Sequence, residues 1–147
     1  MATIAAVSEA ARDEQVVVFR MDAERYGVDI FRVNEIIRLR EITPIPHTER
    51  HIRGLVNLRG KTIPVVDLRV RFGIADVVET AKARIIVVDG DQGQIGMIVD
   101  EVCEVAALSS ASIESPPGLV SGDCVRGVAL RDDRLIALLD LDRVLEA

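Results

Sequence analysis

The stretch RGLVNLRGKTIPVVDLRVRF, which runs from Arg53 to Phe72, occurs a second time in altered form as RGVALRDDRLIALLDLDRVL, from Arg126 to Leu145. The two stretches align without gaps and share residues at several positions: Arg53 with Arg126, Gly54 with Gly127, Ile63 with Ile136, Asp67 with Asp140 and Leu68 with Leu141. A repeat of this length indicates two similar structural units rather than a short-period solenoid.

The segments that precede these two stretches also match. Their shared residues pair as Gly27 with Gly96, Val33 with Val102 and Glu35 with Glu104. We interpret residues shared by both copies as residues that serve the fold. Three positions of the first copy differ from their counterparts: Asn57 faces Leu130, Arg59 faces Asp132 and Gly60 faces Asp133. These three are the better candidates for a function that only one copy performs.

Short apolar runs separated by turn residues predict a mainly β chain. In the first copy the expected strands are Val16–Met21, Arg25–Val28, Leu55–Leu58 and Thr62–Asp67. In the second copy they are Arg84–Asp89, Gln94–Val99, Val102–Leu108, Val125–Leu130 and Leu135–Asp140. Many short strands with regular turns are typical of barrels and sandwiches. Because proline lacks a backbone N–H, Pro64 is expected at an edge strand or a bulge.

Helical structure is expected only in short pieces. The segment Ile30–Leu39 combines helical spacing with β-branched residues, which predicts a helical turn running into a strand. Further turns of helix are expected at Thr48–Ile52, at Leu68–Phe72 with Gly73 as its stop, and at the end of the second copy. Asp67 and Asp140 recur at the ends of strands, so we interpret them as helix caps rather than as catalytic carboxylates.

The composition limits the classes of function. Of the 147 residues 49% are hydrophobic and 3% are aromatic, so Val, Ile and Leu must fill the core and few rings are available for base stacking. The net charge of -6 argues against binding to a nucleic-acid backbone, which requires a basic surface. The two cysteines, Cys103 and Cys124, suggest free thiols and a reducing compartment.

The N-terminal region predicts neither export nor membrane insertion. It lacks the basic and apolar segments of a secretory signal, and no run approaches the roughly 18 apolar residues of a membrane span. We expect residues 1–14 to form a flexible tail, residues 15–147 to form a single domain, and the protein to be cytosolic.

No set of residues predicts catalysis, a cofactor site or a metal site. His47 and His51 are four residues apart, as in some zinc sites, but Pro46 precedes them and no third histidine exists, so we interpret them as surface residues. Cys103 has apolar neighbours that favour a buried, inert thiol. The serines at 109, 110 and 112 lack a nucleophile-elbow pattern, and the glycines at 90, 93 and 96 lie in a predicted hairpin. The chain therefore indicates a binding module rather than an enzyme.

The turn Asn57-Leu58-Arg59-Gly60-Lys61 is the sharpest local signal of function. Gly60 allows a positive φ, and the Asn57 side chain can hydrogen-bond to the local backbone. Such a turn would hold Arg59 at the edge of a sheet, where its planar guanidinium could bind a partner's carboxylate or carbonyl. The alternative is an ordinary solvated arginine in a surface turn.

The chain resembles the CheW family of bacterial chemotaxis coupling proteins. The resemblance is carried by YGVDIFRVNEII (26–37), ITPIP (42–46), IRGLVNLRGKTIPVVDLRVRFG (52–73) and IGMIVDEVCEV (95–105), and it extends from about Val16 to Leu145. It implies two SH3-like five-stranded β-barrel subdomains packed on a shared core, with few short helices. Their approximate extents are 15–80 and 81–147, with strands that may cross between them.

The resemblance also implies a function and its residues. It implies a non-enzymatic, cytoplasmic adaptor that couples a chemoreceptor's cytoplasmic tip to the regulatory domain of a CheA-type histidine kinase in membrane-associated arrays. The receptor-facing residues would be Val33, Glu35, Asn57, Arg59 and Gly60. Val99 and Val102 are candidates either for the kinase-facing surface or for the core. A scaffold in a pilus-linked or other non-flagellar chemosensory system is the alternative. The repeat, by contrast, marks Glu35 as partly structural, because Glu104 is its counterpart.

Overall fold

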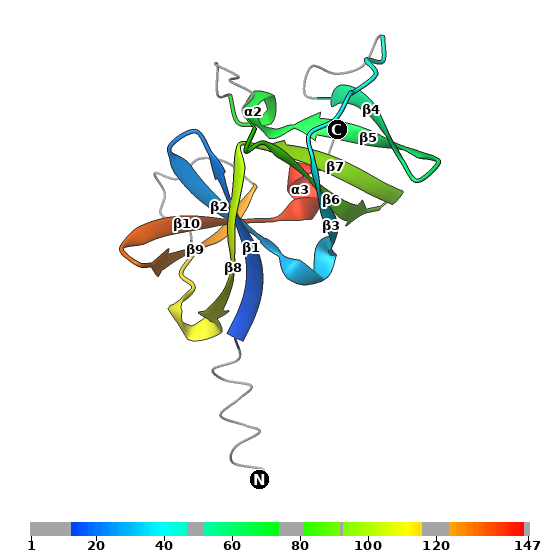
Figure 1. The fold of residues 1–147 in the computed structure, drawn as a ribbon. Coiled ribbons are helices and arrows are strands. Elements are labelled where there is room, and N and C mark those ends of the chain that lie inside the picture. Colours follow the sequence, from blue (N-terminus) through cyan, green and yellow to red (C-terminus); the bar gives the residue numbers. More distant parts are fainter. Residues whose placement is uncertain (1–12, 47–51, 74–80, 92, 116–123, 146–147) are drawn as a thin grey trace.

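The computed structural model describes residues 13–46, 52–73, 81–91, 93–115 and 124–145 (Figure 1). The strands are β1 (Asp13–Met21), β2 (Glu24–Asp29), β3 (Val33–Arg38), β4 (Ile52–Leu58), β5 (Lys61–Asp67), β6 (Arg84–Gly90), β7 (Gly93–Val99), β8 (Glu101–Ser109), β9 (Val125–Arg131) and β10 (Arg134–Leu139). The helical turns are η1 (Ile30–Arg32), α2 (Leu68–Arg71), η2 (Ser110–Ser112) and α3 (Leu141–Val144). The mainly β fold with two five-stranded units is confirmed.

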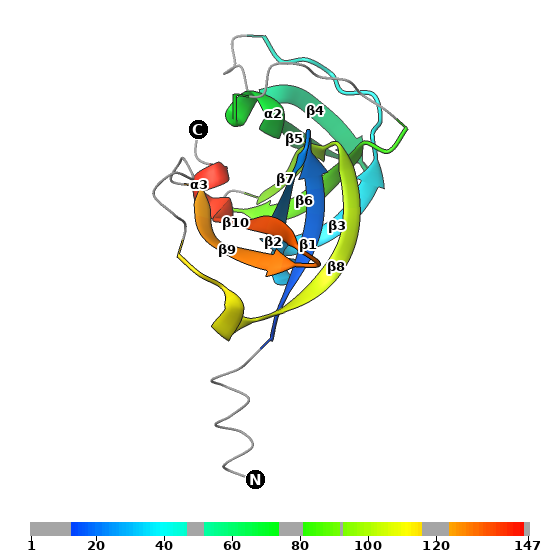
Figure 2. The same cartoon turned by 90° about the vertical axis from the view of Figure 1, so that its left-hand side faces the viewer.

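The two sheets exchange strands between the copies of the repeat. The first sheet has the order β8-β1-β2-β10-β9, and the second sheet has the order β3-β6-β7-β5-β4. Because β1 to β5 correspond in the repeat to β6 to β10, each sheet takes its two central hairpin strands from one copy and its other three strands from the other copy. In each sheet one parallel contact joins the copies, β2 to β10 and β7 to β5. A boundary near residue 80 therefore divides the repeats but not the sheets, which form adjacent units in both views (Figures 1 and 2).

In each sheet, the segment that follows the third strand of the repeat forms hydrogen bonds with the edge strand on the other side. After β3, Thr43 exchanges two backbone hydrogen bonds of 2.8 Å with Leu55 of the edge strand β4. After β8, Glu114 makes the equivalent bridge to Val128 of β9. These contacts fit the SH3-like form that the resemblance implies. They also explain Gly54, where a Cβ atom would lie 2.2 Å from the carbonyl oxygen of Thr43.

Alternating side chains of the strands fill three cores. The interior of the first sheet holds Val16, Val18, Ala106, Leu108, Ala129, Ile136 and Leu138. The interior of the second sheet holds Val56, Leu58, Ile63, Val65, Ile85, Val87 and Ile98. A shared core joins the two sheets and includes Val17, Phe19, Val28, Ile86, Met97, Val99 and Leu139. Within it Tyr26 stacks between Phe19 and Phe72, and burial together with Glu24 raises the pKa of Tyr26 to about 12.

The predicted caps and stops are confirmed. Asp67 accepts a hydrogen bond from the backbone N–H of Arg69 at 3.0 Å, and Asp140 accepts one from Arg143 at 3.4 Å. Gly73 ends α2 with a φ of 74°. The segment from Ile30 forms the expected helical turn running into a strand. The helical turn expected from Thr48 falls outside the described residues except for Ile52, which begins β4, and His47 and His51 also lie outside them.

The expectation that Pro64 lies on an edge strand or a bulge is wrong, because β5 pairs with β4 on one side and with β7 on the other. Leu55, which lies opposite Pro64, directs both its backbone hydrogen bonds to Thr43. The Leu55–Pro64 pair is therefore of the non-hydrogen-bonded type, and the missing N–H of Pro64 faces β7. The parallel register with β7 begins only at Val65, so the proline removes little from the ladder.

The buried guanidinium of Arg69 takes part in a contact that links the two sheets. Arg69 of α2, which is 1% exposed, lies 2.9 Å from the carboxylate of Asp100, in a contact that lacks the alignment of a hydrogen bond. The same carboxylate accepts a 2.7 Å hydrogen bond from the backbone of Asp22, in the turn between β1 and β2. In the other copy the equivalent helix position, Asp142, pairs with Arg32 at 3.1 Å. Both copies therefore have an ion pair between the short helix and the loop that connects two strands, but the arginine lies on the helix in one copy and on the loop in the other.

The two equivalent hairpin turns share a backbone conformation but not a sequence. Arg59 and Gly60 have φ values of 53° and 84°, and Asp132 and Asp133 have values of 51° and 62°. Glycine adopts this left-handed region without steric cost, whereas Asp does so with strain.

We therefore expect Asp133→Gly to raise the free energy of unfolding by about 0.5–1 kcal/mol. Urea denaturation measures the change, and the reciprocal variant Gly60→Asp should lower stability. A stabilising Gly60→Asp would contradict the assignment.

Candidate functional site

Arg59 is held at the tip of the β4–β5 hairpin by a carboxylate from the opposite edge of the same sheet. Its two terminal nitrogens lie 2.7–3.1 Å from both carboxylate oxygens of Glu35, in β3. Asn57 fixes the turn, because its Oδ1 accepts a 3.1 Å hydrogen bond from the backbone N–H of Gly60. The Arg59 side chain remains 69% exposed. A bidentate pair fixes the guanidinium plane and leaves its remaining N–H groups pointing away from Glu35, available to a partner.

Four of the five predicted receptor-facing residues meet at the hairpin tip, and the fifth lies on the strand that carries Glu35. Glu35, Asn57, Arg59 and Gly60 lie together around the hairpin tip. Val33 begins β3 and packs, partly buried, against the shared core. Val33 lies two residues before Glu35 on the same strand and faces the core. We define the Arg59 site as Glu35, Asn57, Arg59 and Gly60.

The two residues considered for the kinase side differ in burial. Val99 is 0% exposed and belongs to the shared core. It is therefore a core residue rather than a residue of the kinase-facing surface. Strand β7 lies inside its sheet between β6 and β5, which covers both of its edges. Val102, in the edge strand β8, is only partly buried against the same core.

The repeat shows a structural task for Glu35 in both copies. Its counterpart Glu104 also binds an arginine, because Arg131 lies 3.1 Å from it and this hydrogen bond raises the pKa of Arg131. The glutamate therefore has the same position and the same task in both copies. The arginines differ, since Arg131 ends strand β9 whereas Arg59 lies one position further along, at the tip of its turn. Glu35 therefore orients Arg59, and the position of this arginine at the tip of the turn distinguishes the first copy from the second.

Further side chains lie near the Arg59 site or on the strand that carries Glu35. Arg40 donates a 3.3 Å hydrogen bond to the backbone oxygen of Asn57, and Lys61 follows the turn directly. On β3 every second residue is exposed, which includes Ile36 at 38% and Arg38. The residue types of β3 do not alternate in this way, so the exposure of its outer face depends on the neighbouring strands.

The second copy presents apolar side chains at the equivalent positions. Val105, Leu130 and Leu135 are 55%, 66% and 50% exposed, and Leu130 and Leu135 are cross-strand neighbours. They correspond in the repeat to Ile36, Asn57 and Thr62. The two copies therefore carry different chemistry on similar outer surfaces.

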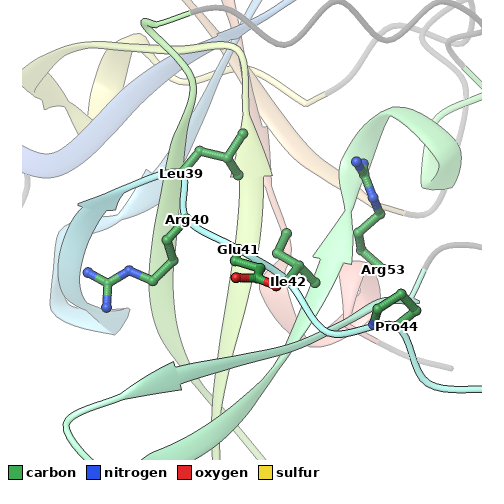
Figure 3. Close-up of a pocket in the computed structure, with 6 residues that line it drawn as sticks. All are labelled: Leu39, Arg40, Glu41, Ile42, Pro44 and Arg53. Carbon is green, nitrogen blue, oxygen red and sulfur yellow. The ribbon is translucent and has the colours of Figure 1, made fainter.

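A shallow, open hollow lies beside the segment that follows β3 (Figure 3). Its lining residues are Leu39, Arg40, Glu41, Ile42, Pro44 and Arg53. The side chains of Arg40 and Arg53 extend away from each other on opposite sides of the segment 41–44, so they do not converge on one ligand position (Figure 3). The lining lacks the enclosed apolar character of most small-molecule sites.

Among the described residues, no group of three or more His, Cys, Asp or Glu side chains is placed to hold a metal ion. In the same part of the chain no helix is long and apolar enough to cross a membrane.

Comparison with known proteins gives a consistent result. The model of the CheW-like domain matches residues 15–147. The chain is 31% identical to the chemotaxis protein CheW of Klebsiella aerogenes, with 100% of this chain and 92% of that protein covered. It is 29% identical to Protein FrzA of Myxococcus xanthus, over 99% and 94% of the two chains. The crystal structure of the scaffolding protein TtCheW from Thermoanaerobacter tengcongensis matches with a TM-score of 0.86 and 42% identity, covering 92% of this chain and 89% of that one.

Proposed function

Because the chain belongs to the CheW-like domain family of chemotaxis scaffold proteins, we propose that it is a non-enzymatic adaptor which couples chemoreceptors to a CheA-type histidine kinase. The observation that carries this proposal is the Arg59 site, in which a guanidinium held at the tip of the turn is 69% exposed, whereas the second copy holds Arg131 at the end of β9 with 36% of its side chain exposed. An adaptor needs two separate binding surfaces, and a duplicated fold supplies two similar ones that can diverge.

On the receptor side, the Arg59 site binds the cytoplasmic tip of the receptor. Glu35 orients Arg59, and the turn formed by Asn57 and Gly60 holds the arginine at the end of the hairpin. Arginines held in this way are common among the few residues that dominate binding energy at protein interfaces. Val33, partly buried nearby on β3, supports this strand from the core side.

On the kinase side, strand β8 of the first sheet meets the kinase's regulatory domain. Two valines of this strand are the candidates: Val102 is partly buried against the shared core, and Val105 is 55% exposed. Contacts between signalling proteins are often small, so each interaction alone should have a micromolar Kd, or about -8 kcal/mol. Tethering in a membrane-associated cytoplasmic array raises the effective concentration of each partner and so increases the overall affinity of the assembly.

The two-surface arrangement predicts that both partners bind at once. A soluble receptor-tip fragment and the isolated kinase regulatory domain should form a ternary complex with this protein, which sedimentation velocity can detect. Val102→Asp should weaken only the kinase contact, as measured by calorimetric titration with each partner.

Val102 also packs against the shared core, so Val102→Asp is accompanied by a second variant, Val105→Asp, at the more exposed position. Selective loss of kinase binding with both variants supports the model. Mutually exclusive partners, or folded variants that lose both contacts or neither, contradict it.

A scaffold in another chemosensory system is the second candidate. Protein FrzA does not carry the CheW name yet matches over nearly the whole chain, so membership of the family leaves the signalling system open. A pull-down from cell lysate distinguishes the candidates by the kinase and the receptors that are recovered.

A further inference from the structure

The surface around the Arg59 site has a charge opposite to that of the protein as a whole. Residues 33–41 and 57–62 contain four basic residues, Arg38, Arg40, Arg59 and Lys61, and two acidic ones, Glu35 and Glu41. The equivalent residues of the second copy, 102–110 and 130–135, contain two basic and three acidic ones. The chain has a net charge of -6, so this excess of positive charge is local to the first copy.

These basic side chains lie on, or directly after, the strands that meet at the Arg59 site. Arg40 is anchored over β4 by its hydrogen bond to the backbone oxygen of Asn57, two residues before Arg59. Lys61 opens β5 opposite Leu58, on the other side of the turn. Arg38 lies on β3, the strand that the Glu35–Arg59 pair joins to the hairpin, and it shares the exposed outer face of that strand with Ile36. We call Arg38, Arg40 and Lys61 the basic rim.

The basic rim is not neutralised within the described part of the chain. Arg59 is paired with Glu35, but among the described residues none of the three rim side chains forms an ion pair, and all three are exposed. The same sheet also exposes apolar atoms, since Ile36 is 38% exposed and Leu55 and Pro64 are partly exposed. The face therefore combines apolar contact area with unpaired positive charge.

We infer that the segment which docks on this face carries carboxylates beside apolar side chains, and that the basic rim determines which receptors the protein binds. This inference rests on the proposed receptor contact and specifies its chemistry. Charges at the rim of an interface act mainly on association rate and on the choice of partner, because like charges repel and opposite charges attract over a Debye length. A receptor tip rich in basic residues would be rejected by the same rim.

The experiment compares Lys61→Glu with Arg134→Glu, a control at the equivalent position of the other hairpin with the same change in net charge. The probe is a soluble receptor-tip fragment, used in its natural form and with its surface Asp and Glu changed to Asn and Gln. Calorimetric titration gives Kd at about 50 and 300 mM salt, where screening differs strongly. Arg38→Glu serves as a second rim variant on a different strand.

We expect Lys61→Glu and Arg38→Glu to weaken binding of the natural fragment about three- to tenfold at low salt, and Arg134→Glu to change it less than about twofold. With the neutralised fragment these differences should vanish. Equal effects of Lys61→Glu and Arg134→Glu, or a rim effect that persists with the neutralised fragment, would overturn the inference. Failure of the wild-type protein to bind either fragment would instead overturn the proposed receptor contact itself.

Discussion

Ile63→Ala and Ile136→Ala should each lower the free energy of unfolding by about 2–5 kcal/mol, the range for truncating a buried isoleucine. Both side chains are 2% exposed, and they occupy the same position in the two copies. Ile63 packs in the interior of the second sheet and Ile136 in the interior of the first. Because each side chain sits in a separate core of similar make-up, the two losses should be comparable.

Urea denaturation of the three proteins measures these losses. Leu135→Ala is a suitable control, because Leu135 neighbours Ile136 but is 50% exposed, and its truncation should cost well under half as much. If Ile63→Ala were neutral while Ile136→Ala unfolded the protein, the equivalence of the two copies would be wrong.

Arg59→Ala should weaken binding of the receptor-tip fragment by about 1–3 kcal/mol while the melting temperature barely moves. The binding loss follows from removing a guanidinium that Glu35 holds in one orientation. The small effect on stability follows from exposure, since Arg59 is 69% exposed and surface ion pairs contribute at most about 1 kcal/mol. Calorimetric titration and thermal denaturation of the same samples give both quantities.

Two further variants sharpen this test. Asp132→Ala changes the equivalent turn of the second copy and should leave receptor binding unaltered. Glu35→Gln removes the charge that orients Arg59 and should weaken binding less than Arg59→Ala, because the guanidinium remains. An Arg59→Ala protein that unfolds readily, yet binds normally when folded, would show that Arg59 serves the fold.

Local features of the fold could be predicted from the sequence because they depend on neighbouring residues. Short apolar runs between turn residues marked the strands, and the recurrence of Asp67 and Asp140 identified caps that accept backbone hydrogen bonds. The turn at Gly60 was predictable because few residue types adopt its backbone conformation. The repeat added the equivalence of Ile63 and Ile136, which both prove to be buried.

Features that depend on pairing between distant strands could not be predicted. Strand β5 reads as a candidate edge because of Pro64, yet β7 from the other copy covers it. Val99 reads as a possible contact residue, yet neighbouring strands bury it completely. The Glu35–Arg59 pair also depends on tertiary structure, because it joins residues 24 positions apart at two edges of one sheet.

The exchange of strands between the copies has a consequence for the origin of the two surfaces. A half-length ancestor, carrying only strands equivalent to β1–β5, could complete both sheets by pairing with a second copy of itself across a two-fold axis. Every mutation in such a homodimer would appear on both faces at once. Joining the halves into one chain breaks that symmetry, so Arg59 can arise on one hairpin while Asp132 occupies the other. Fusion of the halves thereby allows the two faces of the molecule to change independently.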